Sequence, residues 1–453
     1  MLRFRHATYP YVLLGGAVLG IAIGSAALVA QRDGGRTDAA WPHWRGPAHT
    51  GVASGAAPIE WSDTRNVAWK VEVPGRGHSS PVVWGDRIFL TTAIPTDRPA
   101  NEPVAPTGRG RRGTGGGEGV REHRFEVIAF DRASGKVAWR HTAATATPHE
   151  GFHQQYGSFA SNSPTTDGER VYASFGSRGV YAYTMDGRPV WQKDFGVQMR
   201  MFQSFGEGVG PVLDAGNLIV LFDHEGDGFL AMLDAATGRE RWRTPRTDGT
   251  NWAAPLVVSH NGRKQIVVNS PRKVRGYDYE TGAPVWEVAG LGLNTIPRAV
   301  QHQDRVLVMS GFINPQLMSI ALGRQGDLAG TDAITWRANR GLSYTASPVL
   351  HEGTLHFISD TGMVSALDAS TGAPTYQQVR LPNPQNIKAS PVLAGGHLYF
   401  PTEEGDVIVA KVGKTFEIVA ANTLTDQSFV ASPAVANGDL YLRSRTHLFR
   451  IRP

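Results

Sequence analysis

Cysteine is absent from this chain of 453 residues. Its absence excludes disulfides, thiolate metal sites, a cysteine nucleophile, c-type haem attachment and a lipid-modified cysteine. Charged residues are also scarce, at 19%, whereas hydrophobic residues reach 41%, and this balance excludes a disordered chain. The 53 glycines and 28 prolines follow no Gly-X-Y period, which excludes a collagen-like structure. Many turns between short apolar runs are instead typical of an all-β protein.

A long uncharged stretch does occur at the N-terminus, where residues 7–31 carry no charged side chain. Arg3 and Arg5 precede it, and about 20 apolar residues suffice to span a bilayer. The positive-inside rule leaves residues 1–6 in the cytoplasm and exports the rest. Residues 7–31 are therefore predicted to be a signal anchor that holds the protein in the inner membrane, facing the periplasm. Alternatively they are a signal peptide, and cleavage releases a periplasmic or secreted protein. Residues 32–66 follow as a linker and N-terminal extension.

Concentrated positive charge is missing, although the formal net charge is +5. The arginines are scattered and form no basic helix, so we expect no nucleic-acid partner. Residues 108–117, Gly-Arg-Gly-Arg-Arg-Gly-Thr-Gly-Gly-Gly, look like an RNA-binding tract. In an exported protein we interpret them as a flexible loop that covers a ligand face or meets an acidic partner.

One pattern recurs along the chain: a Ser-Pro or Gly-Pro step, β-rich runs separated by Gly-containing turns, and an Asp-x-x-Thr-Gly turn before a closing aromatic residue. A four-stranded propeller blade takes about 40–50 residues. After a first gap of 83 residues, the opening prolines are 42–51 residues apart. We therefore predict an all-β, eight-bladed β-propeller of four-stranded antiparallel blades over residues 67–453. The opening prolines are Pro81, Pro164, Pro211, Pro255, Pro297, Pro348, Pro391 and Pro433.

Three details complete this prediction. An open ring would expose strand edges, so the strand near 67–71 is expected to close the last blade. A Gly/Arg-rich insertion at 93–124 accounts for the wide first gap. The closing aromatic side chains recur around the ring and are expected to pack between neighbouring blades rather than to form a site. They are Trp69, Trp139, Trp191, Trp242, Trp286, Trp336, Tyr376 and Phe416.

The repeat resembles that of pyrroloquinoline-quinone (PQQ) propellers, the quinoprotein alcohol dehydrogenase-like superfamily. Residues 41–47 (Trp-Pro-His-Trp-Arg-Gly-Pro), Ser163-Pro164 and Asn251-Trp252 are similar to exported bacterial PQQ-like propellers, and the resemblance covers about residues 41–453. It implies a propeller that is either a PQQ- and Ca²⁺-dependent enzyme or a non-catalytic scaffold. Many of the enzymes stack the cofactor on a disulfide between adjacent cysteines, and this chain has none. The superfamily's lipoprotein scaffold carries an acylated cysteine that is also missing here.

Polar side chains cluster in the connections that lead into each opening proline. Propellers place ligands around the channel on the face that these connections form, and polar groups converging from several blades would make a concave site. The alternative is that they cap strand ends and bind water. The candidate ligand-binding residues are His78, His153, Asn162, Gln203, Asn251, Trp252, Asn294, Arg298, Tyr344 and Lys388.

Two motifs suggest metals. Asp223, Glu225 and Asp227 alternate along an acidic turn on the same face, where oxygen ligands could hold Ca²⁺; a solvated turn is the alternative. Glu403 and Glu404 could add a carboxylate from another blade. His149-Glu150-Gly151-Phe152-His153 matches the zinc-protease pattern H-E-x-x-H, which requires a helix so that both histidines share a face. Gly151 and the preceding proline predict a loop here instead.

Three hypotheses for function follow. The first is an exported, non-catalytic platform that binds a protein, a polymer or a small-molecule ligand at the cell envelope, and we expect it to be a monomer. The alternative is a quinoprotein dehydrogenase that oxidises an alcohol or sugar with PQQ and Ca²⁺ in the channel. The third is a zinc hydrolase that uses His149 and His153.

Overall fold

The computed structural model describes residues 40–99, 121–383 and 385–453. Within these ranges, no helix is long and apolar enough to cross a membrane. The predicted n-region and the signal segment at 7–31 lie outside the described residues, as do residues 100–120 of the insertion. Residues 93–99 and 121–124 of the insertion belong to two long strands, β3 (Arg87–Pro99) and β4 (Arg121–Asp131), which pair as a hairpin.

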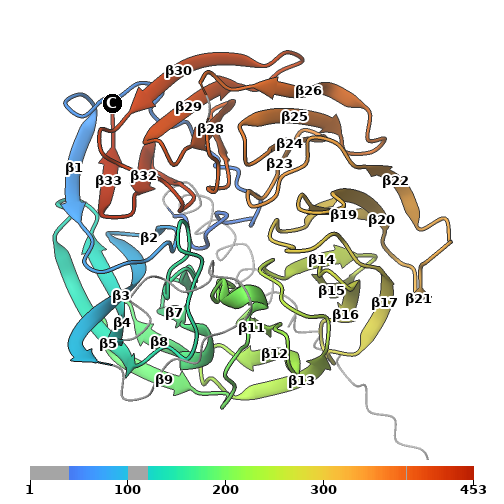
Figure 1. Ribbon diagram of the computed structural model, residues 1–453, viewed down its shortest axis with the longest axis horizontal. Coiled ribbons are helices and arrows are strands. Elements are labelled where there is room, and N and C mark those ends of the chain that lie inside the picture. Colours follow the sequence, from blue (N-terminus) through green and yellow to red (C-terminus); the bar gives the residue numbers. More distant parts are fainter. Residues whose placement is uncertain (1–39, 100–120, 384) are drawn as a thin grey trace, which may run out of the picture. The chain divides into compact units, whose positions relative to one another are not determined.

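Eight antiparallel blades of four strands follow one another around a ring, which confirms the predicted eight-bladed propeller (Figure 1). The first four blades are β2 (Val82–Trp84), β3, β4, β5 (Val137–Ala146); β6 (Thr165–Thr166), β7 (Arg170–Ser174), β8 (Val180–Thr184), β9 (Pro189–Lys193); β10 (Val212–Asp214), β11 (Asn217–Phe222), β12 (Gly228–Asp234), β13 (Glu240–Arg246); and β14 (Leu256–His260), β15 (Arg263–Val268), β16 (Lys273–Asp278), β17 (Pro284–Ala289). The next three are β18 (Val300–His302), β19 (Arg305–Ser310), β20 (Gln316–Ala321), β22 (Ile334–Ala338); β23 (Val349–His351), β24 (Thr354–Ile358), β25 (Met363–Asp368), β26 (Pro374–Arg380); and β27 (Val392–Ala394), β28 (His397–Pro401), β29 (Asp406–Lys411), β30 (Glu417–Thr423).

The last blade joins the two ends of the propeller. It consists of β31 (Ala434–Ala436), β32 (Asp439–Arg443), β33 (His447–Ile451) and the N-terminal strand β1 (Val67–Glu72). β1 pairs antiparallel with β33, so that Lys70 faces Phe449 and Val71 faces Leu448. Figure 1 shows the blue β1 beside the red β33. The predicted ring closure by residues 67–71 is therefore confirmed.

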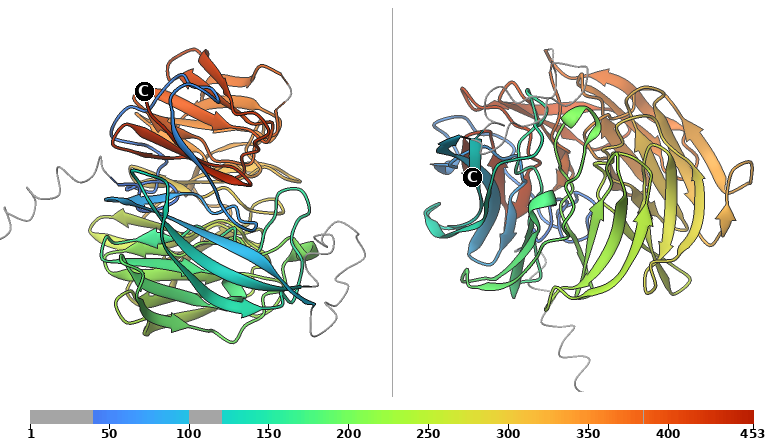
Figure 2. Two further views of the ribbon diagram at one scale, coloured as in Figure 1. Left: turned by 90° about the vertical axis from the view of Figure 1, so that its left-hand side faces the viewer. Right: turned by 60° about the horizontal axis from the view of Figure 1, so that its bottom comes forward.

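Burial differs between the inner and outer strands of a blade. All six residues of β11 are buried, whereas half-buried and exposed side chains alternate along the outer strand β13 up to its buried last residue. Successive side chains of a strand point to opposite faces, so a strand sandwiched between two neighbouring blades is apolar on both faces. Figure 2 shows the blades packed side by side, and the core lies in the seams between them.

The predicted blade aromatics lie in these seams. The indole Nε1 of Trp191 donates to the carbonyl of Ala235 at 2.9 Å, and Ala235 lies in the Asp-x-x-Thr-Gly turn of the next blade. The ring lies against Gly238 of that turn, where φ is +70° and an added Cβ would lie 2.7 Å from the indole. Only glycine suits both the conformation and the close approach. The same indole-to-carbonyl bond recurs in the seams of Trp69, Trp139, Trp242 and Trp336.

Trp286 departs from this arrangement. Its Nε1 donates to the side-chain oxygen of Gln265 in its own blade at 2.9 Å. The following blade lacks the Asp-x-x-Thr-Gly turn and instead carries the short strand β21 (Gly326–Asp327), which pairs with β17 in parallel. Leu322 and Leu328 of this excursion pack with Trp286 in one apolar cluster. The indole of Trp286 therefore points into its own blade, and the excursion that carries β21, which the repeat did not predict, packs over it.

Residues 41–53, here called the channel plug, run across the ring axis and contact inner strands or their leads. Trp41 pairs with Val83 of β2, and Val52 bridges to Leu393 of β27. The buried guanidinium of Arg45 donates to the carbonyls of Pro348 (2.8 Å) and Pro391 (2.6 Å). The innermost strand of each blade has one edge without a strand partner, and the plug provides hydrogen-bond partners for some of the backbone groups there.

Candidate functional site

A pocket of about 220 Å³ opens on the ring axis. Its lining comes from the connections that lead into the inner strands of all eight blades, the face on which the sequence predicted a site. The described residues that line it include His78, Ser80, His153, Tyr156, Ser163, Phe205, Trp252, Ile296, Tyr344, Lys388, Ser390, Val430 and Ser432. Trp44 of the channel plug also lines the pocket, so the plug contributes to the site.

Five of the ten predicted ligand-binding residues lie in this pocket: His78, His153, Trp252, Tyr344 and Lys388. They come from connections that are far apart in the sequence, and ring closure brings them together. Burial, followed by the charge of Arg443, lowers the pKa of His78 well below its usual value, so this imidazole is neutral at pH 7. Its Nε2 lies 3.2 Å from the carbonyl of Gly157, to which it donates.

Three predicted asparagines hold the surrounding loops. Asn294 donates to the hydroxyl of Tyr344 at 3.0 Å and so positions a pocket residue. Asn162 donates to the carbonyl of Val209 at 2.8 Å, and Asn251 donates to the carboxylate of Asp223 at 3.2 Å.

The other two predicted residues do not line the pocket. Gln203 is exposed in the short 3-10 helix η4 (Phe202–Ser204), and the guanidinium of Arg298 is buried against the carbonyls of Pro255 and of His49 in the plug.

Aromatic side chains form much of the pocket wall, and two of them, Tyr156 and Phe205, were not among the predicted site residues. Tyr156 stacks on His153 with ring centroids 3.7 Å apart. Phe205 packs edge-on against His153 at 4.9 Å and lies 6.5 Å from Trp252. Neither Tyr156 nor Phe205 occupies a recurrent position of the repeat, so only the folded connections show that both face the axis.

The charges at the pocket rim are paired. Lys388 bonds Asp360 at 2.6 Å and lies 4.9 Å above the ring of Tyr156. A shallow depression that shares Tyr156 and Lys388 continues outward over Glu403 and Arg445, which form an ion pair at 2.8 Å. Glu404 instead accepts from the backbone and side chain of Asn386. Glu403 and Glu404 therefore support the loops.

The pocket floor is made by the serines that precede the opening prolines. The backbone N–H of Ser390 donates to Oγ of Ser432, Ser432 donates to Ser80, and Ser80 donates to Ser163, at 2.9–3.0 Å. Ser347 continues this chain by donating to Ser390. These serines were not among the predicted site residues, although their recurrence before proline was the signal that could have identified them.

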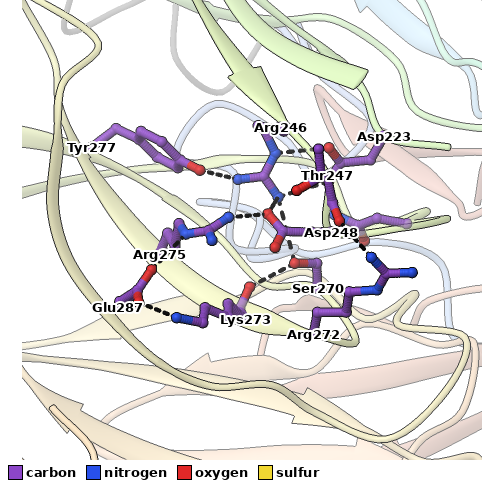
Figure 3. Close-up of polar contacts among 11 residues, drawn as sticks. Asp223, Arg246, Thr247, Asp248, Ser270, Arg272, Lys273, Arg275, Tyr277 and Glu287 are labelled. Carbon is purple, nitrogen blue, oxygen red and sulfur yellow. Dashed lines mark hydrogen bonds and ion pairs between the residues drawn. The ribbon is translucent and has the colours of Figure 1, made fainter. Parts of the chain in front are cut away.

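The acidic turn is engaged in ion pairs, and its three carboxylates do not converge. Both carboxylate oxygens of Asp223 accept from the buried guanidinium of Arg246, at 2.7 and 2.8 Å (Figure 3). Asp248 also pairs with Arg246 at 3.0 Å. Glu225 and Asp227 are exposed, and the three carboxylates do not form a group with metal-ligand spacing among the described residues. In place of the expected calcium ligands, the structure shows a buried ion-pair network that ties the end of β11 to β13 and β16.

The H-E-x-x-H motif does not bring its two histidines together. Residues 149–153 contain no helix, and His153 turns into the central pocket while His149 lies elsewhere. Nε2 of His149 donates to the carbonyl of Met199 at 2.6 Å, and Nδ1 accepts from Arg178 at 3.1 Å, so both ring nitrogens are engaged. His149, Glu150 and Glu207 are the one group with metal-ligand spacing in the part of the chain that the structure describes. The loop expected at this motif is therefore present, and His149 and His153 do not lie together as the zinc hypothesis requires.

The fold and the repeat agree with a known family. The family model described as outer membrane protein assembly factor BamB (PQQ_2) matches residues 123–288 and 180–413. The chain belongs to this PQQ-repeat family. Outer membrane protein assembly factor BamB of Yersinia pestis is 23% identical over 333 residues, which cover 71% of this PQQ-like propeller and 78% of the relative.

Two solved structures share the propeller fold. Quinohemoprotein alcohol dehydrogenase from Comamonas testosteroni superposes with a TM-score of 0.62 at 11% identity, over 92% of this chain and 81% of that chain. BamB from Moraxella catarrhalis has a TM-score of 0.52 at 15% identity, over 80% of this chain and 97% of that chain. Both likenesses concern the fold alone.

The pocket residues of this PQQ-like propeller do not fit a PQQ–calcium pair. Calcium takes about six to eight oxygen ligands. The lining contains one carboxylate, Glu207, and its oxygens accept from the backbone and hydroxyl of Ser177 at 2.6 and 2.5 Å. The pocket of about 220 Å³ is also smaller than the usual range of about 300–1,000 Å³ for ligand sites.

Proposed function

We propose that this chain is an exported, non-catalytic propeller that binds a protein partner at the cell envelope through the face that carries the pocket. Its family is described as an outer membrane protein assembly factor, and the Yersinia pestis relative has the same description. The predicted signal segment at residues 7–31 agrees with export.

An exposed apolar patch on this face carries the proposal. Leu293 is 44% exposed, Phe312 37% and Ile313 54%. Phe312 stacks on the pocket residue Tyr344 with centroids 4.9 Å apart. Gly292 packs closely against the carbonyls of residues 312–314, so the two loops adjoin. Contiguous exposed apolar side chains beside a pocket are typical of a protein-binding surface.

The backbone of the patch supports the same conclusion. Ile313 has φ +33°, although β-branched residues avoid the left-handed region. Strain of this kind costs about 1–3 kcal/mol and is found where function requires a particular conformation. Here the strained turn presents an isoleucine to solvent.

A double substitution tests the proposal. Leu293→Ser with Ile313→Asn removes the apolar side chains, and asparagine accepts the positive φ at 313, so the fold is expected to persist. Val190→Ser is the matched control because Val190 is similarly exposed on the outer strand β9. Crosslinking in an envelope fraction of the source cell is expected to capture an outer-membrane assembly protein with the wild type and V190S, and at least tenfold less with the double variant. Equal capture by all three chains would refute the proposal.

The same preparation tests the dehydrogenase alternative. Since the pocket offers no set of calcium ligands, we expect PQQ with Ca²⁺ to give no shift in the absorbance of the quinone and no dye reduction with a panel of alcohols and sugars. Stoichiometric binding with dye reduction would replace the proposed function by the enzymatic one.

A further inference from the structure

Three arginines beneath the pocket are buried without a carboxylate partner among the residues that the structure describes. Arg45, Arg298 and Arg443 are each at most 2% exposed. In the described part of the chain, their guanidinium groups donate to backbone carbonyls and, for Arg443, also to the Ser79 hydroxyl. Burial lowers the pKa of each to about 9, so all three are charged at neutral pH. Arg246 is equally buried but has two carboxylates beside it (Figure 3).

The unpaired charges lie directly behind the serine floor of the pocket. Arg443 donates to the carbonyl of Ser79, and Arg45 donates to the carbonyl of Pro391; both acceptors are chain neighbours of floor serines. The backbone N–H of Arg298 donates to Oγ of Ser347, so this residue extends the serine chain itself. Charges interact strongly in a low-dielectric interior, so these three guanidinium groups favour negative charge in the pocket.

The floor serines offer hydrogen-bond donors to the same place. Ser80, Ser163, Ser390 and Ser432 line the pocket, and three of them are at most 3% exposed. Oγ of Ser80, Ser163 and Ser432 each accepts a backbone N–H from the preceding blade, and Ser390 accepts from Ser347. A hydroxyl carries one proton to donate. None of these four protons has an acceptor among the described residues, so all four are available to an occupant of the pocket.

We propose that this floor binds the carboxylate of an organic ligand whose apolar or aromatic body lies between Trp252 and Tyr344. A carboxylate accepts at about four positions on two oxygens, which suits donors that converge from four consecutive blades. Hydrogen bonds to a charged acceptor are about twice as strong as neutral ones. The aromatic walls exclude water around the body and add apolar contact. The proposal is independent of the apolar patch at Leu293 and Ile313.

Matched pairs of small probes test the charge requirement. Titration calorimetry on the full chain compares 3-phenylpropanoate with 3-phenylpropanamide, and inorganic phosphate serves as an ion without an apolar body. We expect the carboxylate to bind at least about tenfold more tightly than the amide, because the amide loses the charge-assisted bonds. The proposal would be overturned if the acid and the amide bind equally, or if phosphate binds as tightly as the acid. It would also be overturned if no probe binds at concentrations up to roughly 10 mM.

Two sources can supply such a group, a free organic acid or the C-terminus of a polypeptide. Gly-Gly-Phe and its C-terminal amide distinguish them. Binding of the free peptide comparable to 3-phenylpropanoate indicates a chain terminus, and binding of the small acid alone indicates a free acid. Either result supports the carboxylate site.

A serine pair provides the matched variants. Ser390→Ala removes a hydroxyl donor of the pocket floor. Ser347→Ala removes a hydroxyl from the same hydrogen-bonded series of serines, but Ser347 does not line the pocket. Each variant deprives one backbone N–H of its acceptor, so both are expected to lower the melting temperature by similar amounts. S390A is expected to weaken 3-phenylpropanoate about fivefold or more, and S347A to leave its affinity within twofold. An equal loss in both variants contradicts the proposal, and the acid–amide comparison on the wild type decides it if S390A does not fold.

Discussion

Glu150 is the side chain where burial and charge conflict most directly. It is 5% exposed and accepts the backbone N–H of Met201 with its carboxylate oxygens. Burial raises the pKa of Glu150 to about 8, the Met201 bond opposes this rise, and the nearby charge of Glu207 adds to it. Arg178 is close but bonds His149 instead. At neutral pH the native protein therefore holds a proton that the unfolded chain has released.

Glu150→Gln tests this conflict. Between about pH 4.5 and pH 8 the native state binds the extra proton, so the free energy of unfolding falls as the pH rises through this range. Glutamine keeps the acceptor for Met201 without the charge. We expect E150Q to raise the free energy of unfolding by roughly 2–4 kcal/mol at pH 8 and to change it little at pH 4.5, as measured by urea denaturation. The control is Glu280→Gln, at an exposed position, which should stay within about 0.5 kcal/mol. An equal gain at both pH values would show that Glu150 is charged when folded.

At the scale of residues, the sequence indicates which side chains face the channel better than it indicates which side chains they contact. Trp252 and Lys388 lie three residues before an opening proline and Tyr344 lies four residues before one, which is why the sequence placed them on the channel face. All three line the pocket. Asp223 was misjudged because its partner Arg246 lies at the end of another strand, and no periodicity connects the two.

Among elements, the seam between two blades is the recurring unit of stability. An outer-strand tryptophan donates to a carbonyl of the next turn and covers its glycine. The seam of Trp69 is special because this residue lies on β1, which is held in its blade by pairing with β33 rather than by a hairpin. Its Nε1 donates to the carbonyl of Arg132 at 3.1 Å.

Trp69→Ala is expected to lower the free energy of unfolding by about 2–3 kcal/mol, somewhat less than a fully buried tryptophan would, because Trp69 is half-buried. Urea denaturation with an unchanged m-value would measure the loss. Val137→Ala, at the exposed start of β5, is the control and should stay within about 0.5 kcal/mol. A change below 1 kcal/mol for W69A would indicate that β1 contributes little to closing the ring.

Strands and their order followed from the repeat, but two elements did not. β21 replaces a turn, and no copy of the repeat contains its counterpart. The blade that begins at β18 is shifted by two residues: Arg298, not Ile296 before Pro297, occupies the position that serine holds elsewhere, as its bond to Ser347 shows. Proline spacing alone could not reveal this shift, because a blade tolerates a proline on either side of that position.

For the whole molecule, the channel plug is the feature that links most blades. His43 and His49 within it stack at 4.0 Å, and Gly51 has φ +77° with no room for a Cβ beside the guanidinium of Arg45. Burial, followed by the charge of Arg298, lowers the pKa of His43 to about 3, and burial also lowers the pKa of His49. The plug is thus built from imidazoles that are neutral when folded.

Acid is therefore expected to loosen the plug. A histidine whose pKa is lowered on folding contributes full stability above pH 6.5, and this stability is lost as the pH falls below that value. His49→Asn removes one such group and suits the local φ of +59°. Thermal melting at pH 7.5 and pH 4.5 should show a smaller acid-induced drop for H49N, by about 2 kcal/mol. Identical pH dependence of H49N and the wild type would show that His49 is already protonated in the plug.

The sequence singled out residues 41–47 as part of a family resemblance, but it could not locate them on the ring axis. That position depends on carbonyls of Pro348 and Pro391, which lie in other blades. Contacts between segments hundreds of residues apart leave no local periodicity, so they emerge only from the closed ring.

The pairing of β1 with β33 also requires the two ends of the propeller to meet during folding. Val71 and Leu448 must meet across almost the full length of the propeller, the costliest kind of contact for a chain to form. Until residue 451 is available, the sheet edge of the last blade stays open to other chains. A newly synthesised molecule therefore cannot close its ring until the last strand, β33, has been made and has paired with β1.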